Sequence, residues 1–221
     1  MDQEYVIEIL NACKSEEEFK EVWNEAKEDF DWDLHSASLC EHLNKYFNVW
    51  WDSNKFVYFY SFYLCKYCLD YLEIWWDKDK FNWGNCSYCL CQYCHKYFNI
   101  WWNSENFNWE DASEYLCHYC NKYFNIWWNS EKFNWIDDSE YLCHYCNKYF
   151  NIWWSPDKFN WEDASDYLCQ HCSENIDIWW DSKKFNWNFL NYLQKYCLKY
   201  KHIWEKDFMK YKIKRSLKNE D

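Results

Sequence analysis

The chain has 221 residues and a formal net charge of -13, and 26% of its residues are aromatic, whereas it holds one glycine and one proline. Two-residue hairpins and phosphate-binding loops need glycine, so this composition excludes P-loop and Rossmann nucleotide sites and argues against β-sandwiches. An acidic body also repels phosphate backbones, which disfavours nucleic-acid binding over most of the chain.

Residues 1–35 show a polar helical pattern, and we predict that they form N-terminal capping helices. Phe30-Asp31-Trp32 in this segment resembles the Phe-Asn-Trp sequence that recurs later. The acidic start lacks the basic and apolar regions of a signal peptide, so we expect a cytoplasmic protein with reduced cysteines. No segment approaches the roughly 20 apolar residues that a membrane-spanning helix needs.

Residues 36–187 are a tandem repeat. A Trp-Trp pair recurs at steps of 25 and then 26 residues, and a leucine and a phenylalanine keep the same spacing. A period of this length predicts an all-α fold, an α-solenoid of about seven units, each with one long helix and a one-turn helix. Because no linker interrupts the repeats, we interpret the chain as a single continuous domain.

The limits of the two helices in a unit follow from their capping residues. The long helix has two candidate N-caps, which are Asn134 and, at a capping-box spacing, Asp137 with Glu140. We expect this helix to continue to the Trp-Trp pair. The short helix is then expected to begin at Ser155, with the only proline, Pro156, at its first position.

Residues 188–221 form a degenerate C-terminal repeat, ending at Ile203-Trp204, and a basic tail. From Lys195 onward the chain carries nine basic and four acidic residues, so residues 1–194 carry 15 basic and 33 acidic ones. The simplest interpretation of the tail is a charged terminal helix end that increases solubility. Its alternative role is nucleic-acid binding, which we expect only through residues 195–221.

Cys-x-x-Cys pairs recur in the repeats, and two such pairs are able to form a zinc or copper site. On a helical wheel, however, one cysteine of each pair lies in the core and the other on a flank. We expect that flank to meet Tyr and Ile of the next unit, so packing is the favoured interpretation and no cofactor is predicted. The alternative, a thiol-rich metal-binding protein, centres on Cys86, Cys89, Cys91 and Cys94.

The chain is predicted to be a non-catalytic scaffold for protein–protein interaction. Stacked identical repeats give the polar residues at each repeat position the same surroundings, whereas an active site needs surroundings that differ from those of the other repeats. His118 and His144 are expected on a solvated face. The second tryptophan of each pair is expected at the margin of the apolar face. Packing between repeats is the favoured interpretation of these residues, and the functional alternative is that they bind Lys or Arg side chains of a partner's basic segment. These candidate partner-binding residues are Trp51, Trp76, Trp102, Trp128, Trp154 and Trp180.

The repeated Leu-Cys-x-Tyr-Cys, Ile-Trp-Trp and Lys-Phe-Asn-Trp sequences over residues 36–187 resemble those of uncharacterised Trp- and Cys-containing repeat proteins of giant DNA viruses of amoebae. The resemblance implies a viral interaction scaffold located in the host cytosol or the virion. It implies no activity, and no functional residue is carried over from it.

Overall fold

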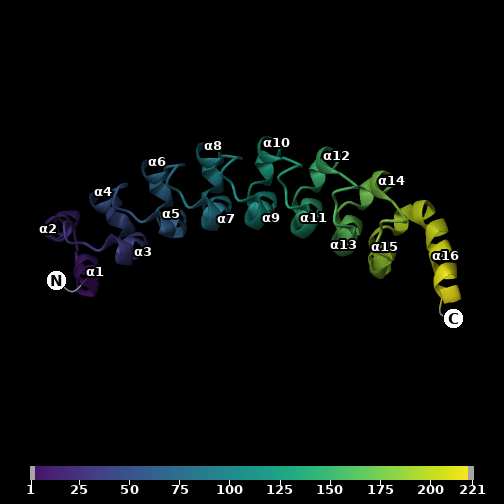
Figure 1. Ribbon diagram of the computed structural model, residues 1–221, viewed down its shortest axis with the longest axis horizontal. Helices are drawn as coiled ribbons and strands as arrows, with labels where there is room; N and C mark the ends of the chain where they lie inside the picture. Colours follow the sequence, from purple (N-terminus) through teal and green to yellow (C-terminus); the bar gives the residue numbers. More distant parts are fainter. Residues whose placement is uncertain (1–2, 219–221) are drawn as a thin grey trace. The chain divides into compact units, whose positions relative to one another are not determined.

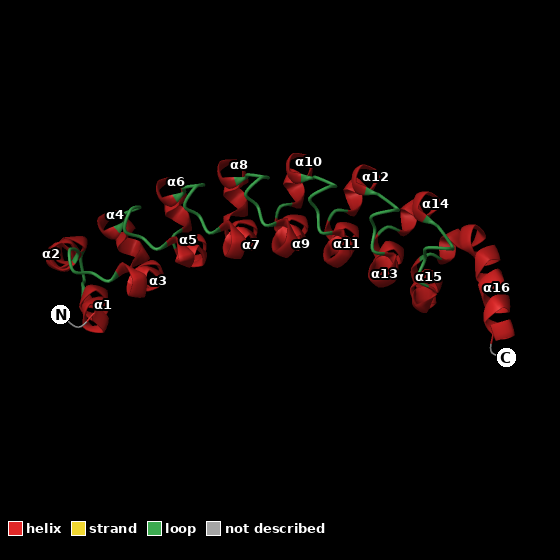
Figure 2. Ribbon diagram, in the orientation of Figure 1, coloured by secondary structure: helices red, strands yellow, loops and turns green. Residues whose placement is uncertain are grey.

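The computed structural model describes residues 3–218, and these residues form helices, turns and loops without a β-strand (Figure 2). Residues 1–2 of the predicted N-terminal cap and residues 219–221 of the predicted basic tail lie outside the described part. The chain forms two compact units, residues 1–112 and 113–221, and the boundary falls within one helix. The prediction of a single continuous domain stays a prediction.

In the first unit, two capping helices precede three repeats (Figure 1). The long helices α1, α3, α5 and α7 follow one another as packed neighbours, and the one-turn helices α4, α6 and α8 form a second layer. The elements are α1 (Gln3–Ala12), α2 (Glu16–Ala26), α3 (Trp32–Leu43), α4 (Phe47–Trp50), α5 (Ser61–Tyr67), α6 (Leu72–Trp75), α7 (Trp83–Cys94), α8 (Phe98–Trp101) and the start of α9 (Trp109–Tyr119).

The second unit continues the same pattern (Figure 1). Its long helices α11, α13 and α15 pack successively, and its one-turn helices again form their own layer. The elements are the rest of α9, α10 (Phe124–Trp127), α11 (Trp135–Tyr145), α12 (Phe150–Trp153), α13 (Trp161–His171), α14 (Ile176–Trp179), α15 (Leu190–Tyr196) and α16 (Lys201–Lys218). The predicted all-α solenoid, with a long and a one-turn helix in each repeat, is confirmed.

The long helix ends earlier than expected, at the second cysteine of each pair. Cys146 leaves the helix with φ -116° and ψ 16°, and a three-residue 3₁₀ turn separates it from α12. The Cys146 carbonyl oxygen accepts a hydrogen bond from the Tyr149 amide within this turn and a second one, of 2.9 Å, from the indole nitrogen of Trp153. The expectation of one continuous helix up to the Trp-Trp pair was therefore wrong, because the backbone tightens into a 3₁₀ turn whose carbonyl also binds a buried indole.

This indole bond recurs throughout the chain and explains the repeated tryptophan. The first tryptophan of each pair is about 1% exposed and donates to the carbonyl seven residues before it. The seven donors are Trp50, Trp75, Trp101, Trp127, Trp153, Trp179 and Trp204, with nitrogen–oxygen distances of 2.8 to 3.0 Å.

The N-cap of the long helix is the asparagine before the tryptophan. The side-chain oxygen of Asn134 accepts from the amide of Asp137, and its side-chain nitrogen donates to the Asp137 carboxylate. In the next repeat, the side-chain nitrogen of Asn160 also donates to the carbonyl of Ile136, which lies in the preceding helix. The first of the two cap alternatives is thus correct, and the asparagine joins adjacent repeats as well as capping its own helix.

The residues Ser155 to Phe159 form a single hydrogen-bonded turn, in which the Ser155 carbonyl accepts from the amides of Lys158 and Phe159. The expectation of the one-turn helix at this place was wrong. That helix lies earlier, at Phe150–Trp153, where the buried phenylalanine and tryptophan anchor it in the core.

Candidate interaction surface

The second tryptophan of each pair is half-buried and enclosed by aromatic rings of its own chain. The Trp128 ring stacks on Phe124 at 5.2 Å, and its edge meets Trp135 at 5.7 Å and Phe133 at 5.4 Å between ring centroids. The same enclosure surrounds Trp154. Internal packing therefore occupies much of the ring area that the sequence analysis assigned to a partner.

The cysteines form a continuous row between repeats. The Cys146 thiol lies 4.0 Å from the carbonyl oxygen of Cys117, and the Cys172 thiol lies 3.9 Å from that of Cys143. The first cysteine of one repeat thus meets the second cysteine of the next. The expectation that this flank meets Tyr and Ile was wrong, because the helix break at the second cysteine turns the two positions toward each other.

All fifteen cysteines are buried, and none of them is in a disulfide. Burial raises the pKa of Cys143 well above its ordinary value, and the neighbouring Cys172 thiol adds to the rise. A neutral buried thiol behaves as a small hydrophobic side chain, so the row fills space between the repeats.

The four cysteines of the metal alternative do not converge on one point. Cys86 and Cys89 are hydrogen-bonded to each other, whereas the Cys94 thiol lies 4.0 Å from the carbonyl of Cys65 in the preceding repeat. The Cys89 hydrogen bond lowers the pKa of Cys86 against the opposing effect of burial. Across residues 3–218 there is no group of three or more His, Cys, Asp or Glu side chains placed to hold a metal ion.

Charge is separated between two faces of the second unit. Its residues 113–119, 135–145 and 161–171, all in long helices, hold seven carboxylates and no lysine or arginine. The lysines of the same repeats lie in the 3₁₀ turns and in the loops after the Trp-Trp pairs, as Lys148 and Lys158 do. Lys158 binds the Ser130 carbonyl and pairs with Glu131 there. These three long-helix segments consequently form an acidic surface that contains no lysine or arginine of its own.

Tyrosines alternate with these carboxylates from helix to helix. Tyr141 on α11 is hydrogen-bonded to Glu114 on α9, and Tyr167 on α13 is hydrogen-bonded to Glu140 on α11. The hydrogen bond to Glu114, followed by burial, raises the pKa of Tyr141. We call the set Glu114, Tyr115, Glu140, Tyr141, Asp166, Tyr167 and Tyr192 the tyrosine–carboxylate row.

Two aspartates at these helices are buried, namely Asp166 of the row and Asp138 beside it. Burial, with the nearby charges of Glu114 and Asp137, raises the pKa of Asp138 to about 7, and its side chain is 6% exposed. Asp166 is 8% exposed, its Oδ2 accepts from Gln170 at 3.1 Å, and its Oδ1 is buried without a hydrogen-bond partner. Burial likewise raises the pKa of Asp166. Both aspartates therefore take up a proton more readily than an exposed aspartate does.

The two histidines assigned to a solvated face are exposed, yet their rings also bridge the repeats. His118 stacks on Tyr145 at 4.4 Å, and His144 stacks on His171 at 4.4 Å. Burial, and then the proximity of His144, lowers the pKa of His171. These rings form one edge of the tyrosine–carboxylate row.

A shallow cavity of about 260 Å³ opens in the row between α9 and α11. Its lining consists of Glu114, Tyr115, His118, Tyr119 and Tyr141. Four aromatic rings and one carboxylate thus surround it. The Tyr115 and Tyr119 rings, one helical turn apart, are nearly parallel with centroids separated by 6.2 Å.

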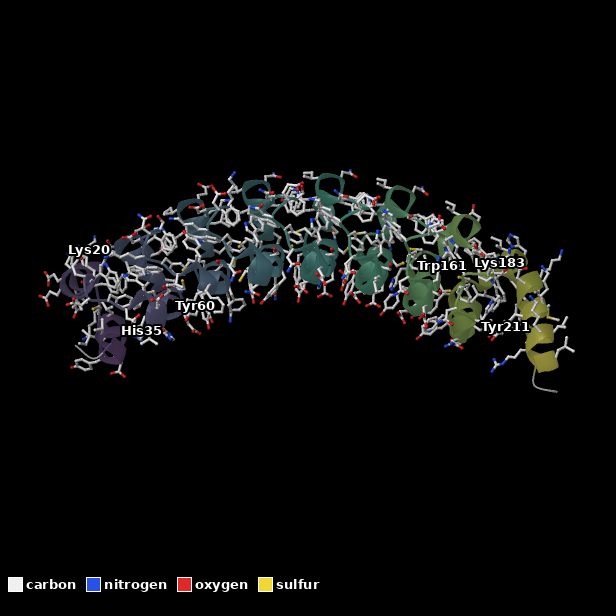
Figure 3. All side chains as sticks on the ribbon, in the orientation of Figure 1. Lys20, His35, Tyr60, Trp161, Lys183 and Tyr211 are labelled. Carbon is white, nitrogen blue, oxygen red and sulfur yellow. The ribbon has the colours of Figure 1, made fainter. Side chains whose placement is uncertain are left out.

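A second cavity, of about 490 Å³, lies between the loop after α14 and the C-terminal helix α16. Lys183, Lys210 and Lys214 line it together with Trp187 and Tyr211, whose rings stack at 4.6 Å. Lys183 and Tyr211 are labelled in Figure 3. Asp207 also lines the cavity and pairs with Lys210 at 2.9 Å. The predicted basic tail therefore contacts the last full repeat through Tyr211, whereas its residues 212–217 are exposed.

Sequence analysis missed two rows of residues. One is a buried serine at every repeat, whose hydroxyl bonds the helix carbonyl four residues earlier and accepts an amide of the next repeat, as Ser139 does for Asn160. The other is the tyrosine–carboxylate row. Both were visible as polar residues that keep the repeat spacing, namely Ser87, Ser113, Ser139 and Ser165, and Glu114, Glu140 and Asp166.

Comparison with protein families, curated proteins and solved structures finds no match to this chain. Within residues 3–218, no helix combines the length and apolar character needed to cross a membrane.

Proposed function

We propose that the protein is a non-catalytic scaffold that binds a basic segment of a partner protein through the acidic, tyrosine-rich face of its second unit. The observation that carries this proposal is the charge separation: the helical residues 113–119, 135–145 and 161–171 hold seven carboxyl groups, five of them at least partly exposed, and no lysine or arginine. Lysine and arginine side chains complement such a face through ion pairs and through contacts with tyrosine rings.

The proposal moves the binding surface away from the second tryptophans. Trp128 and Trp154 are enclosed by their own neighbours, whereas Glu114, Glu140 and the row tyrosines are only partly buried. In this proposal the second tryptophans of the pairs affect binding indirectly, because they pack between the repeats and hold the long helices in place.

The test compares two double variants of equal charge. Glu114→Gln with Glu140→Gln removes two carboxylates from the acidic face, and Glu174→Gln with Asp177→Asn removes two exposed ones near α14. The probe is a fluorescent 15-residue peptide with four lysines, titrated at several salt concentrations. We expect the first variant to lose at least about tenfold in affinity and the second less than about threefold. Equal losses, or no binding by the unchanged protein, would contradict the proposal.

A second candidate function is the binding of a nucleic-acid phosphate backbone near α16. The observation in its favour is the cavity lined by Lys183, Lys210 and Lys214 beside an aromatic stack. Single-stranded RNA of about 10 nucleotides is the probe, and Lys210→Gln with Lys214→Gln should reduce both affinity and its salt dependence. Binding that survives this change would exclude the site.

All fifteen cysteines are buried outside any disulfide, which supports a reducing compartment for this scaffold. The cytosol of a host cell, or a virion assembled in it, is the proposed location. Thiol labelling of protein isolated from its source organism tests this, since disulfide-bonded cysteines would contradict it.

A further inference from the structure

The cavity between α9 and α11 differs in chemistry from an ordinary acidic patch. Tyr115, Tyr119, Tyr141 and the His118 ring supply most of its lining, and Glu114 is its single carboxylate. Tyr141 already donates a hydrogen bond to Glu114. The cavity thus offers aromatic faces and a partly satisfied negative charge.

Such a lining favours one kind of cation. A primary ammonium carries three N–H groups, and each needs an acceptor when it leaves water. A trimethylated ammonium has no N–H group, is weakly hydrated, and is stabilised by the faces of aromatic rings. A metal ion fits less well, since one carboxylate supplies too few oxygen ligands.

The chain itself shows that tyrosines at this place in the repeat accept an ammonium. In α15 the ammonium of Lys195 lies 4.6 Å from the ring centroid of Tyr196, and in α5 that of Lys66 lies 4.7 Å from Tyr67. In α9 the residue that corresponds to these lysines is His118, whose ring stacks on Tyr119 at 4.2 Å between centroids. At this cavity the chain therefore places an imidazole ring, and not a lysine ammonium, against the tyrosine.

We propose that the cavity lined by Glu114, Tyr115, His118, Tyr119 and Tyr141 binds an alkylated ammonium group, such as the trimethylated lysine side chain of a partner protein. This inference rests on the proposed function and names the side chain that the acidic face selects. Glu114 supplies the charge, and the three tyrosines supply the ring faces. The neighbouring carboxylates Asp138 and Glu140 add negative potential.

The experiment uses the full chain and two fluorescent 15-residue peptides with four lysines each, identical except that one central lysine is trimethylated. We expect the trimethylated peptide to bind at least about threefold more tightly. Tetramethylammonium chloride should compete with it more strongly than ammonium chloride does at equal concentration.

Two variants locate the site. Tyr115→Leu should reduce the ratio of the two dissociation constants to about one. Tyr196→Leu removes the tyrosine of α15 that corresponds to Tyr119 and lies outside the cavity, so it should leave the ratio unchanged. The ratio is measured within one protein sample, so a partly unfolded variant still gives a valid reading. Circular dichroism confirms that each variant remains helical.

The outcomes separate the inference from the proposed function. If both peptides bind the unchanged protein equally, the inference is wrong and the proposed function stands. If neither peptide binds, both are wrong. A trimethyl preference that persists in Tyr115→Leu would place the ammonium elsewhere and overturn the assignment of this cavity.

Discussion

Asp138 is the residue at which a single substitution should most increase stability. Other repeats have Ala112 and Ala164 at the position of Asp138, and both alanines are buried. A methyl group therefore fits the space, while the carboxyl of Asp138 is 6% exposed and surrounded by like charges. Asp138→Ala removes a buried charge without leaving a large cavity.

The size of the effect follows from the pKa of Asp138. Burial raises this pKa from an ordinary 3.8 to about 7, so the ionised form destabilises the fold by about 4 kcal/mol at pH 8, because each pKa unit corresponds to about 1.4 kcal/mol. Between these two values the folded protein binds more protons than the unfolded chain. The destabilisation therefore decreases as the pH falls, to roughly 2 kcal/mol at pH 5.

Urea titrations followed by circular dichroism at pH 8 and pH 5 measure this difference. We expect Asp138→Ala to be the more stable protein at both values and its advantage to be larger at pH 8. Asp138→Asn serves as the control, since it keeps the shape and polarity of the side chain but cannot ionise. An advantage that does not change with pH, or an alanine variant less stable than the parent, would refute the argument.

Three further substitutions test the repeat packing. Ser139→Ala removes the buried acceptor of the Asn160 amide and should destabilise the protein by about 1 to 3 kcal/mol. Ser130→Ala, at a partly exposed serine, is the control and should destabilise it by much less. Equal losses would contradict the role of Ser139 as a bridge between repeats. Trp153→Phe removes the donor to the Cys146 carbonyl and leaves a void, so the same titration should show a loss of at least about 2 kcal/mol, and a smaller loss would mean that solvent replaces the bond. The pKa of His171 is lower in the folded protein than its ordinary value of 6.5, so protonation of this residue at lower pH favours the unfolded chain. Between pH 7.5 and 5.5, His171→Tyr should therefore lose less stability than the parent. Identical losses would exclude the effect.

Periodicity predicted the architecture, because it reports which side chains recur on a buried face whatever the local backbone does. It located the first tryptophan of each pair in the core and gave the asparagine as one of two candidate N-caps. It did not locate the helix break at residues such as Cys146, because the apolar positions beyond the break still fit a helical wheel. The indole bond of Trp153 that satisfies the break spans seven residues, and no capping rule for the sequence alone describes it.

The candidate site was predicted only in its chemistry. An acidic, aromatic surface for a basic partner was expected, with tryptophans such as Trp128 as its candidate residues and packing as their favoured interpretation. Tyr115 and Tyr141 were not singled out. Hydrophobicity places both residue types at the margin of the apolar face. Their roles separate only when contacts are known, since three rings of its own chain enclose Trp128, whereas Tyr141 meets a carboxylate and a cavity.

Repetition also limits where a site can arise. Bonds that every repeat makes, such as the indole and serine bonds, are needed for stacking and cannot distinguish one unit from another. A selective site must instead come from positions where the repeats differ while the stacking bonds stay intact. Cys89 stands in α7 where α9 has Tyr115, and Lys195 stands in α15 where α9 has His118. The cavity between α9 and α11 thus has the Tyr115 ring, which α7 lacks, and has no lysine at the position of Lys195 in α15. These differences between repeats favour this place for an external ammonium.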